Sequence, residues 1–209
     1  MSVLRPGSFL LALLMLMGVF NSAVANDANN YSGFQYGVLD YDGTNLGVPL
    51  SFKPSTLVGR MGSFINNYLA LEARVGFGLS DSTVTISRID TTLGHEIIEQ
   101  YEYDVENIFA FYLLGNIPVS NRFDIYGLVG MSSVDVETTI NSTEIHMATS
   151  TEVASFNDTN SATENGLSYG LGASFKVAGK TSLNLEYMSY LDKSDLAIKL
   201  FSVGVLFNF

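Results

Sequence analysis

The chain has 209 residues, a formal net charge of −11 and no cysteine. The acidic balance argues against nucleic-acid binding, because a nucleic-acid-binding protein needs a basic surface. The lack of cysteine excludes a disulfide framework and a lipid anchor carried on a cysteine, so an exported form must be stabilised by its core or by lipid.

The first residues have the pattern of a secretory signal peptide. Arg5 supplies a positive charge, residues 9–20 (FLLALLMLMGVF) form an apolar run, and Ala23 and Ala25 fit a small-x-small cleavage site. The apolar run is too short for a transmembrane helix, which needs about 20 residues. We therefore predict that residues 1–25 are removed during export.

Residues 26–209, the predicted mature domain, alternate between apolar and polar side chains with a period of two. The clearest runs are LALEARVGFGLS, residues 69–80, and GLSYGLGASFKV, residues 166–177. In both runs large apolar residues share one face, and glycines with a few polar or charged residues share the other. Eight strands are expected, at residues 33–41, 56–65, 68–80, 105–117, 122–134, 166–177, 181–191 and 196–209.

The connections between these segments alternate between short turns and mostly long excursions. Turn-forming residues occur at 66–67, 118–121 and 178–180. The long excursions occupy residues 42–55, 81–104 and 135–165. In an up-and-down barrel all the short turns lie at one end, and outer-membrane barrels have short periplasmic turns and longer extracellular loops.

The polar face separates a membrane barrel from a soluble barrel such as a lipocalin, which would bury its apolar face. It carries glycines, among them Gly76 and Gly170, between single charges. Glycines suit a narrow barrel interior, whereas strands facing water would carry Lys, Thr and Glu throughout. The sequence therefore predicts an all-β, eight-stranded antiparallel up-and-down transmembrane β-barrel with its apolar side toward lipid.

Some strand positions are ambiguous. Both faces of residues 105–117 are apolar, so the pattern assigns no inward face there. In residues 122–134 the alternation sends Tyr126 inward, unless it belongs to an interfacial aromatic girdle. Lys199 falls on the lipid face of a regular last strand, where either snorkelling or a β-bulge would accommodate it.

Four charged residues of the polar face are expected to meet inside the barrel: Arg60, Glu72, Arg74 and Glu186. A buried unpaired charge costs several kcal/mol, so these groups should satisfy one another. An eight-stranded barrel is just wide enough inside for side chains, which favours a salt-bridged network that fills and pins it. The alternative is a gated ion path along Arg60, Glu72 and Arg74.

The excursions at residues 81–104 and 135–165 are acidic and hydroxyl-rich, with Arg88 as their single basic residue apart from histidine. Residues 83–89 and 95–106 are expected to pair above the membrane. The acidic tips act either as solvated surface or as contacts for a surface ligand. They also suit bridging through divalent cations to lipopolysaccharide phosphates.

No set of catalytic residues is apparent. Glu144 and His146 would share a strand face, but the spacing of His95 and His146 fixes no third metal ligand. The sequence contains no G-x-S-x-G motif and no phosphate-binding glycine loop. We therefore predict no catalytic residue, no metal, no cofactor and no enzyme activity. A lipid A-modifying enzyme, which would need a His-Ser or His-Asp-Ser set at the membrane interface, is kept as an alternative.

Four segments together resemble the outer-membrane β-barrel family that includes the OmpA-type transmembrane domain, OmpX-like proteins and the opacity proteins. They are YGVLDYD, TLVGRMGSFINNYLALEARVGFGLSD, LLGNIPVSNRFDIYGLVGMS and FSVGVLFNF, and the resemblance covers residues 33–209. It implies a place in the Gram-negative outer membrane, in contact with its lipid and lipopolysaccharide. It also implies folding by the β-barrel assembly machinery, whose signal is a terminal aromatic after alternating apolar residues. The residues matching that signal are Val203, Val205, Phe207 and Phe209.

The expected protein is a monomeric outer-membrane barrel with a structural or surface-interaction, adhesion-like role through its acidic extracellular loops. A small diffusion channel is an alternative from another class. The last strand is expected to close the barrel by pairing with residues 34–40. No peptidoglycan-binding domain is expected after it.

Overall fold

The computed structural model describes residues 30–45, 48–92, 94–193 and 196–209. These residues form ten strands, and none of them forms a helix long and apolar enough to cross a membrane. The predicted cleavage residues Ala23 and Ala25 lie outside the described residues. The strands are β1 (Asn30–Asn45), β2 (Val48–Phe52), β3 (Ser55–Asn66), β4 (Leu69–Gly78), β5 (Ser82–Asp90), β6 (His95–Pro118), β7 (Phe123–His146), β8 (Thr151–Ala178), β9 (Thr181–Asp192) and β10 (Leu196–Asn208).

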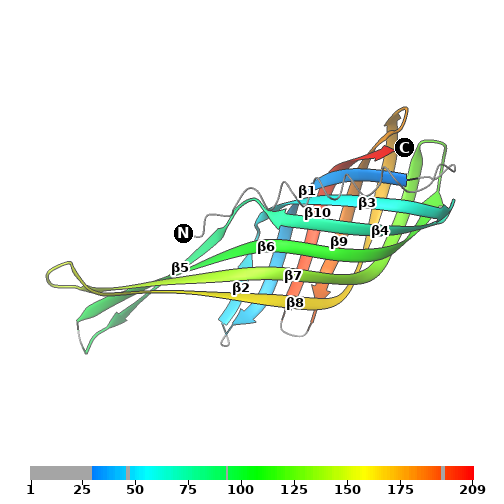
Figure 1. Cartoon of the computed structure of the whole chain (residues 1–209). Helices are drawn as coiled ribbons and strands as arrows, with labels where there is room; N and C mark the ends of the chain where they lie inside the picture. The colour runs from blue at the N-terminus through cyan, green and yellow to red at the C-terminus, as the bar shows by residue number, and fades with distance from the viewer. Residues whose placement is uncertain (1–29, 46–47, 93, 194–195) are drawn as a thin grey trace.

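Eight of these strands form a closed antiparallel ring in the order β1, β3, β4, β6, β7, β8, β9, β10 (Figure 1). The ring closes where β10 pairs with β1, from Tyr31 opposite Asn208 to Gly43 opposite Leu196. β2 pairs with the end of β1, and β5 pairs with β6, outside the ring. The predicted eight-stranded up-and-down barrel and its closure by the last strand are therefore confirmed.

The short connections are tight turns fixed by local hydrogen bonds. The Asn66 side chain accepts hydrogen bonds from the backbone amides of Tyr68 and Leu69, at 2.8 and 2.9 Å. Gly179 has a φ of 50°, a left-handed conformation that glycine adopts without steric cost. These turns lie at one end of the ring, as the alternation of short and long connections predicted.

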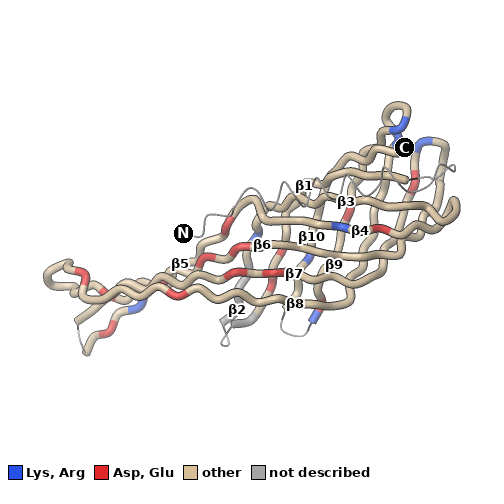
Figure 2. The backbone as a smooth tube through the Cα atoms, in the orientation of Figure 1, with Lys and Arg blue, Asp and Glu red and all other residues tan. Residues whose placement is uncertain are grey.

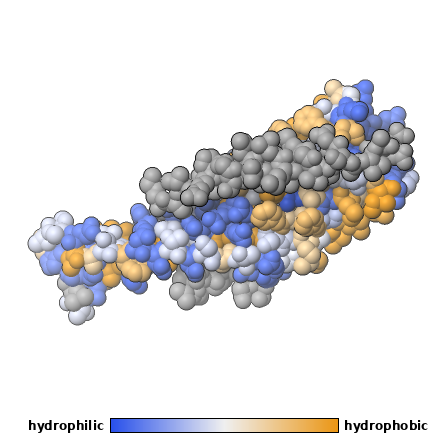
Figure 3. Space-filling model, viewed as in Figure 1, coloured by the Kyte–Doolittle hydropathy of each residue, from blue (hydrophilic) through white to orange (hydrophobic). Residues whose placement is uncertain are grey.

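The outer surface of the ring is apolar. Phe111, Leu171 and Phe201 are 72%, 73% and 58% exposed, whereas their neighbours along each strand point inward. Figure 3 shows hydrophobic residues gathered on the barrel and hydrophilic residues toward the far end of the molecule. This arrangement is the reverse of a soluble barrel, which would bury such residues.

The strands that the sequence left ambiguous now have defined faces. Ile108 and Tyr112 of β6 are buried inside, while Phe109 and Phe111 face outward. Tyr126 of β7 is 5% exposed and points inward, so the inward alternative is correct for this residue. Both faces of β6 are apolar because part of the interior is itself an apolar core.

Lys199 lies on the outward face of β10, opposite Asp40 of β1. The pairing with β9 shifts register beside it, but the extra residue is Tyr190 of β9. The expected irregularity is therefore real, yet it does not turn Lys199 inward. An opposite charge on the neighbouring strand accompanies Lys199 on this face.

Strands β6, β7 and β8 continue far beyond the ring, with 24, 24 and 28 residues. Their outer parts and β5 form the extension, which comprises residues 82–90, 95–106, 135–146 and 151–165 and projects to the left in Figure 1. The predicted pairing of residues 83–89 with residues 95–106 is confirmed. The expectation of a long loop over residues 135–165 was wrong, because this threonine- and valine-containing stretch continues the β7–β8 hairpin.

Candidate functional site

The structure brings together the four charged residues predicted for the interior. This lumen cluster consists of Arg60, Glu72, Arg74 and Glu186, whose side chains are at most 1% exposed. Arg60 Nη2 lies 2.5 Å from Glu72 Oε2, and Arg60 Nη1 lies 3.2 Å from Glu186 Oε2. Arg74 Nε lies 2.6 Å from Glu72 Oε1, and Arg74 Nη1 lies 2.5 Å from Glu186 Oε1. Each arginine therefore bridges both glutamates, and the cluster has no net charge.

Strand register explains how these residues meet. Arg60 of β3 lies opposite Arg74 of β4, and Glu72 is two residues further along the same face. Glu186 reaches them from β9, on the other side of the ring. The repulsion between the two neighbouring arginines is offset because a carboxylate lies between them on either side.

Tyrosines complete the cluster. The Tyr31 hydroxyl donates to Glu72 Oε2 at 2.5 Å, and the Tyr126 hydroxyl donates to Glu186 Oε2 at 2.9 Å. The Arg74 guanidinium lies 4.9 Å from the centroid of the Tyr112 ring, a cation–π contact. Alternation along β7 indicated the inward direction of Tyr126, but Tyr31 precedes the first predicted strand and carried no such signal.

Two inward glycines make room for these rings. A Cβ on Gly62 would lie 2.2 Å from Tyr31 Cζ, and a Cβ on Gly172 would lie 2.2 Å from Tyr126 Cζ. In each case the tyrosine is the direct cross-strand partner of the glycine. The inward glycines of the polar strand face thus leave the space that the tyrosine rings occupy.

An apolar plug fills the interior on the loop side of the lumen cluster. Its side chains come from six strands of the ring, and none has exposed surface. The apolar plug consists of Leu39, Val58, Ile108, Val134, Met188, Leu191, Ile198 and Leu200. Together with the paired charges below it, this packing occupies the interior and leaves the charged groups out of contact with water.

The base of the extension has a different character, because carboxylates of β6 and β7 gather there side by side. Asp104 of β6 lies directly opposite Glu137 of β7. Burial and the neighbouring carboxylates, Asp81 foremost, raise the pKa of both Glu102 and Asp104 above the usual carboxyl range. Burial and Glu137 raise the pKa of Glu106 in the same way. Figure 2 shows the acidic residues following β6 and β7 away from the ring.

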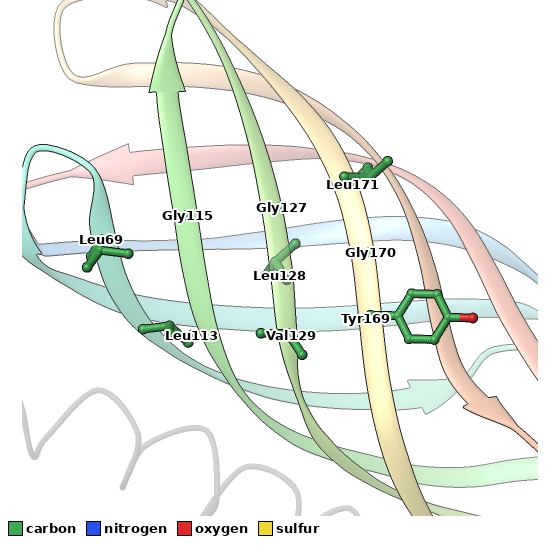
Figure 4. A pocket seen from close by; sticks show the side chains of 9 residues that line it. All are labelled: Leu69, Leu113, Gly115, Gly127, Leu128, Val129, Tyr169, Gly170 and Leu171. Carbon is green, nitrogen blue, oxygen red and sulfur yellow. The ribbon is translucent and has the colours of Figure 1, made fainter.

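One groove of about 550 Å³ lies on the outer, apolar face of β4, β6, β7 and β8 (Figure 4). Gly115 and Gly127 form its floor as cross-strand partners, and outward side chains such as Leu69, Leu113 and Leu171 form its walls. Tyr169 supplies the single polar side-chain group in this lining. The groove therefore offers no arrangement for acid–base or nucleophilic chemistry.

The remaining predicted residues lie at opposite ends of the molecule. The residues matching the assembly signal follow the outward face of β10, and the Phe209 amide donates to the Asn30 carbonyl at 2.9 Å. His95 and His146 lie at the far end of the extension, opposite each other on β6 and β7. Among the described residues, no three His, Asp or Glu side chains converge on a position that could hold a metal ion.

Residues 9–209 match the family model described as outer membrane protein beta-barrel domain. No curated protein matches the chain significantly. One similar solved structure is that of Ail, the attachment invasion locus protein of Yersinia pestis, with 13% sequence identity and a TM-score of 0.49. The match covers 87% of this chain and 99% of Ail. Neisserial surface protein A has 12% identity, 88% and 100% coverage, and a TM-score of 0.49. The outer membrane protease OmpT of Escherichia coli has 8% identity, 90% and 99% coverage, and a TM-score of 0.47. Likeness at this level carries no function from one protein to another.

Proposed function

Because the chain belongs to the outer membrane protein β-barrel domain family, we propose that it is a closed barrel that presents an acidic surface-interaction module outside the cell. It is an integral protein of the Gram-negative outer membrane, with its apolar face in lipid. The observation that carries the proposal is the contrast between a filled interior and the extension, in which residues 135–146 of β7 pair with residues 151–163 of β8 beyond the ring.

The filled interior supports a non-conducting barrel over a small diffusion channel. The apolar plug has no exposed surface, and every charge of the lumen cluster has an opposite charge within hydrogen-bond distance. An ion would have to displace both layers to pass. Planar-bilayer recordings of the refolded full chain should show no conductance steps, and reproducible steps would contradict a closed barrel.

The extension supports contact with a basic partner surface. Between residues 135 and 165 the chain has no lysine or arginine, and hydroxyls bind some of its carboxylates, as Thr163 does for Asp135 at 2.7 Å. The proposed ligands are cationic patches on other cells, or lipopolysaccharide phosphates bridged by divalent cations. Both would be recognised through carboxylates and hydroxyls.

A short-hairpin variant tests this role. Thr138 and Asn160 are cross-strand partners, so replacing residues 139–159 with Asn-Gly leaves a two-residue hairpin turn in register. Cells displaying the full chain should adhere to epithelial layers several-fold better than cells displaying the variant. Surface labelling must show equal amounts of both proteins. Equal adhesion at equal display would contradict the interaction role.

A non-catalytic role is part of the proposal. Mass spectrometry of lipid A from cells with and without the protein should show the same acyl chains. Incubation of the refolded protein with an unfolded substrate protein should yield no new fragments. A change in either measurement would favour the enzyme alternative.

The terminal residues Val203, Val205, Phe207 and Phe209 are proposed as the signal read by the assembly machinery. In the folded barrel Val203, Val205 and Phe207 lie on the outward face of β10, and Phe209 directly follows this strand. Deleting Phe209 should lower the amount assembled in cells several-fold, while spontaneous refolding into detergent stays nearly unchanged. A parallel loss in both settings would mean that Phe209 acts through barrel stability instead.

A further inference from the structure

His95 and His146 form a cross-strand pair at the far end of the extension. They are direct partners in the β6–β7 ladder, and their ring centroids lie 5.2 Å apart. They are the two histidines of the chain, separated by 51 positions in the sequence, and their side chains share one face of the hairpin. Two histidines on one sheet face at this distance are near enough for both rings to bind one ligand.

The Nδ1 atom of each ring already has a partner. His95 Nδ1 lies 2.5 Å from Glu144 Oε1, and His146 Nδ1 lies 3.3 Å from the Thr149 hydroxyl. A carboxylate on one imidazole nitrogen is the usual way in which proteins orient a histidine that binds a metal through the other nitrogen. Glu144 thus fixes the His95 ring and leaves its Nε2 for a ligand.

The separation of the rings suits a shared metal ion. A metal–nitrogen bond of about 2.1 Å and tetrahedral ligation place the two ring centroids about 5 Å apart, since each centroid lies about 1.1 Å from its nitrogen. The observed 5.2 Å agrees with this value. The separation of the rings is therefore compatible with one ion bound between them.

The charge around the pair favours a cation. Asp90 of β5 lies opposite His95, and Glu144 lies on the same face as His146. The nearest arginine in the adjoining strand, Arg88, is paired with Glu99 at 2.8 Å. The face is thus acidic, and its one guanidinium is already engaged.

We propose that His95 and His146 form a binding site for a divalent transition metal that prefers imidazole, such as Zn²⁺ or Cu²⁺. The two histidines are the protein ligands and water completes the coordination, in keeping with the lack of a third converging side chain among the described residues. The bound ion would clamp the ends of β6 and β7. The sequence predicted no metal because the spacing of the two histidines fixes no third ligand. Their pairing depends on strand register, which the spacing does not show.

Metal titration of the refolded full chain, prepared without a polyhistidine tag, tests the site. Isothermal titration with Zn²⁺ alone should give one ion per chain. With Cu²⁺ alone, electron paramagnetic resonance should show hyperfine structure from two imidazole nitrogens. Absence of Zn²⁺ binding, or a Cu²⁺ spectrum without nitrogen coupling, would overturn the proposal.

Single substitutions separate the histidine pair from general attraction of cations to an acidic surface. His95→Gln and His146→Gln should each weaken Zn²⁺ binding at least tenfold. Glu144→Gln should weaken it about tenfold, the lower end of the range for a residue that orients a metal-binding histidine.

Glu152→Gln is the matched control. Glu152 lies opposite Ile145, on the other face of the same end of the hairpin. The substitution therefore removes one negative charge, as Glu144→Gln does, without changing a residue on the face of the two histidines. Its affinity should match that of the unmodified protein, and a loss equal to that of the histidine variants would overturn the proposal. Heat-dependent gel migration verifies that each variant is folded.

Discussion

In the barrel, two arginines and two glutamates pair with one another out of contact with water, whereas at the base of the extension carboxylates face carboxylates. Asp104 lies opposite Glu137, an arrangement that is unfavourable for two like charges on paired strands. The difference follows from solvent. The side chains of the lumen cluster are at most 1% exposed and must be paired, whereas the carboxylates at the base of the extension are only partly buried and keep part of their hydration.

The comparison shows that the two regions are stabilised by different means. The barrel depends on packing and on exact pairing of its charges, so single changes there should be costly. The extension depends on backbone pairing between long strands, so single side-chain changes there should cost little. Four predictions test this division, from the largest expected effect to the smallest.

Two ion pairs of equal length should differ greatly in their contribution to stability. The distance from Arg74 Nη1 to Glu186 Oε1 is 2.5 Å, and so is the distance from Lys193 Nζ to Glu164 Oε2. The side chains of the Arg74–Glu186 pair are 0% exposed, whereas those of Lys193 and Glu164 are 42% and 37% exposed. Arg74→Met should lower the free energy of unfolding by about 3–5 kcal/mol, because it leaves buried charge unpaired. Glu164→Gln should cost less than about 1 kcal/mol.

Urea unfolding of both variants in lipid vesicles provides this measurement. Similar losses for the buried and the exposed pair would break the comparison between barrel and extension. A loss confined to the Arg74 variant would support it.

A methyl group should be costly inside the barrel and harmless outside it. Gly172→Ala would place Cβ 2.2 Å from the Tyr126 ring, whereas a Cβ on Gly115 meets no atom within 4 Å. We expect Gly172→Ala to destabilise the barrel by about 1–3 kcal/mol through overpacking. Gly115→Ala, the matched control, should leave the unfolding midpoint unchanged. Equal midpoints for both variants would argue against close packing of Tyr126.

The extension should become more stable as the pH falls. The pKa values of Glu102, Asp104 and Glu106 are raised in the folded extension, so the folded state binds protons more tightly than the unfolded state. The extension therefore gains stability as the pH falls through the raised pKa values toward the ordinary carboxyl range. It loses this stability as the pH rises again through the raised pKa values. Hydrogen exchange should show more protection of residues 98–106 at pH 5 than at pH 8, after correction for intrinsic rates.

The barrel amides should show no such gain over the same pH interval, which makes them an internal control. A Glu102→Gln and Glu106→Gln double variant should have a smaller pH response in the extension. An unchanged response would mean that these carboxylates are not its source.

Removal of the far part of the β7–β8 hairpin should have the smallest effect on the barrel. The short-hairpin variant keeps every strand of the ring and all residues of the lumen cluster. Its urea unfolding midpoint in lipid vesicles should equal that of the full chain. A clear decrease would show that the extension stabilises the barrel and that the two regions are coupled.

Much of the barrel could be predicted from the sequence, because inward and outward alternation is a local property of each strand. The faces of β4, β8 and β10 follow from single runs such as residues 69–80, and the inward charges Arg60, Glu72, Arg74 and Glu186 follow from the same parity. Turn residues and the spacing of the segments then indicated eight strands and their order.

The sequence could not predict what depends on contacts between strands. The inward face of residues 105–117 became clear only when Ile108 was seen in the apolar plug, since both faces of that strand are apolar. Tyr31 reached Glu72, and His95 reached His146, through register across the sheet. By itself the sequence determined which side chains point inward along each regular strand, because a pleat repeats every two residues. Only the tertiary structure decided which of them meet, because register is the sum of many contacts between residues far apart in the chain.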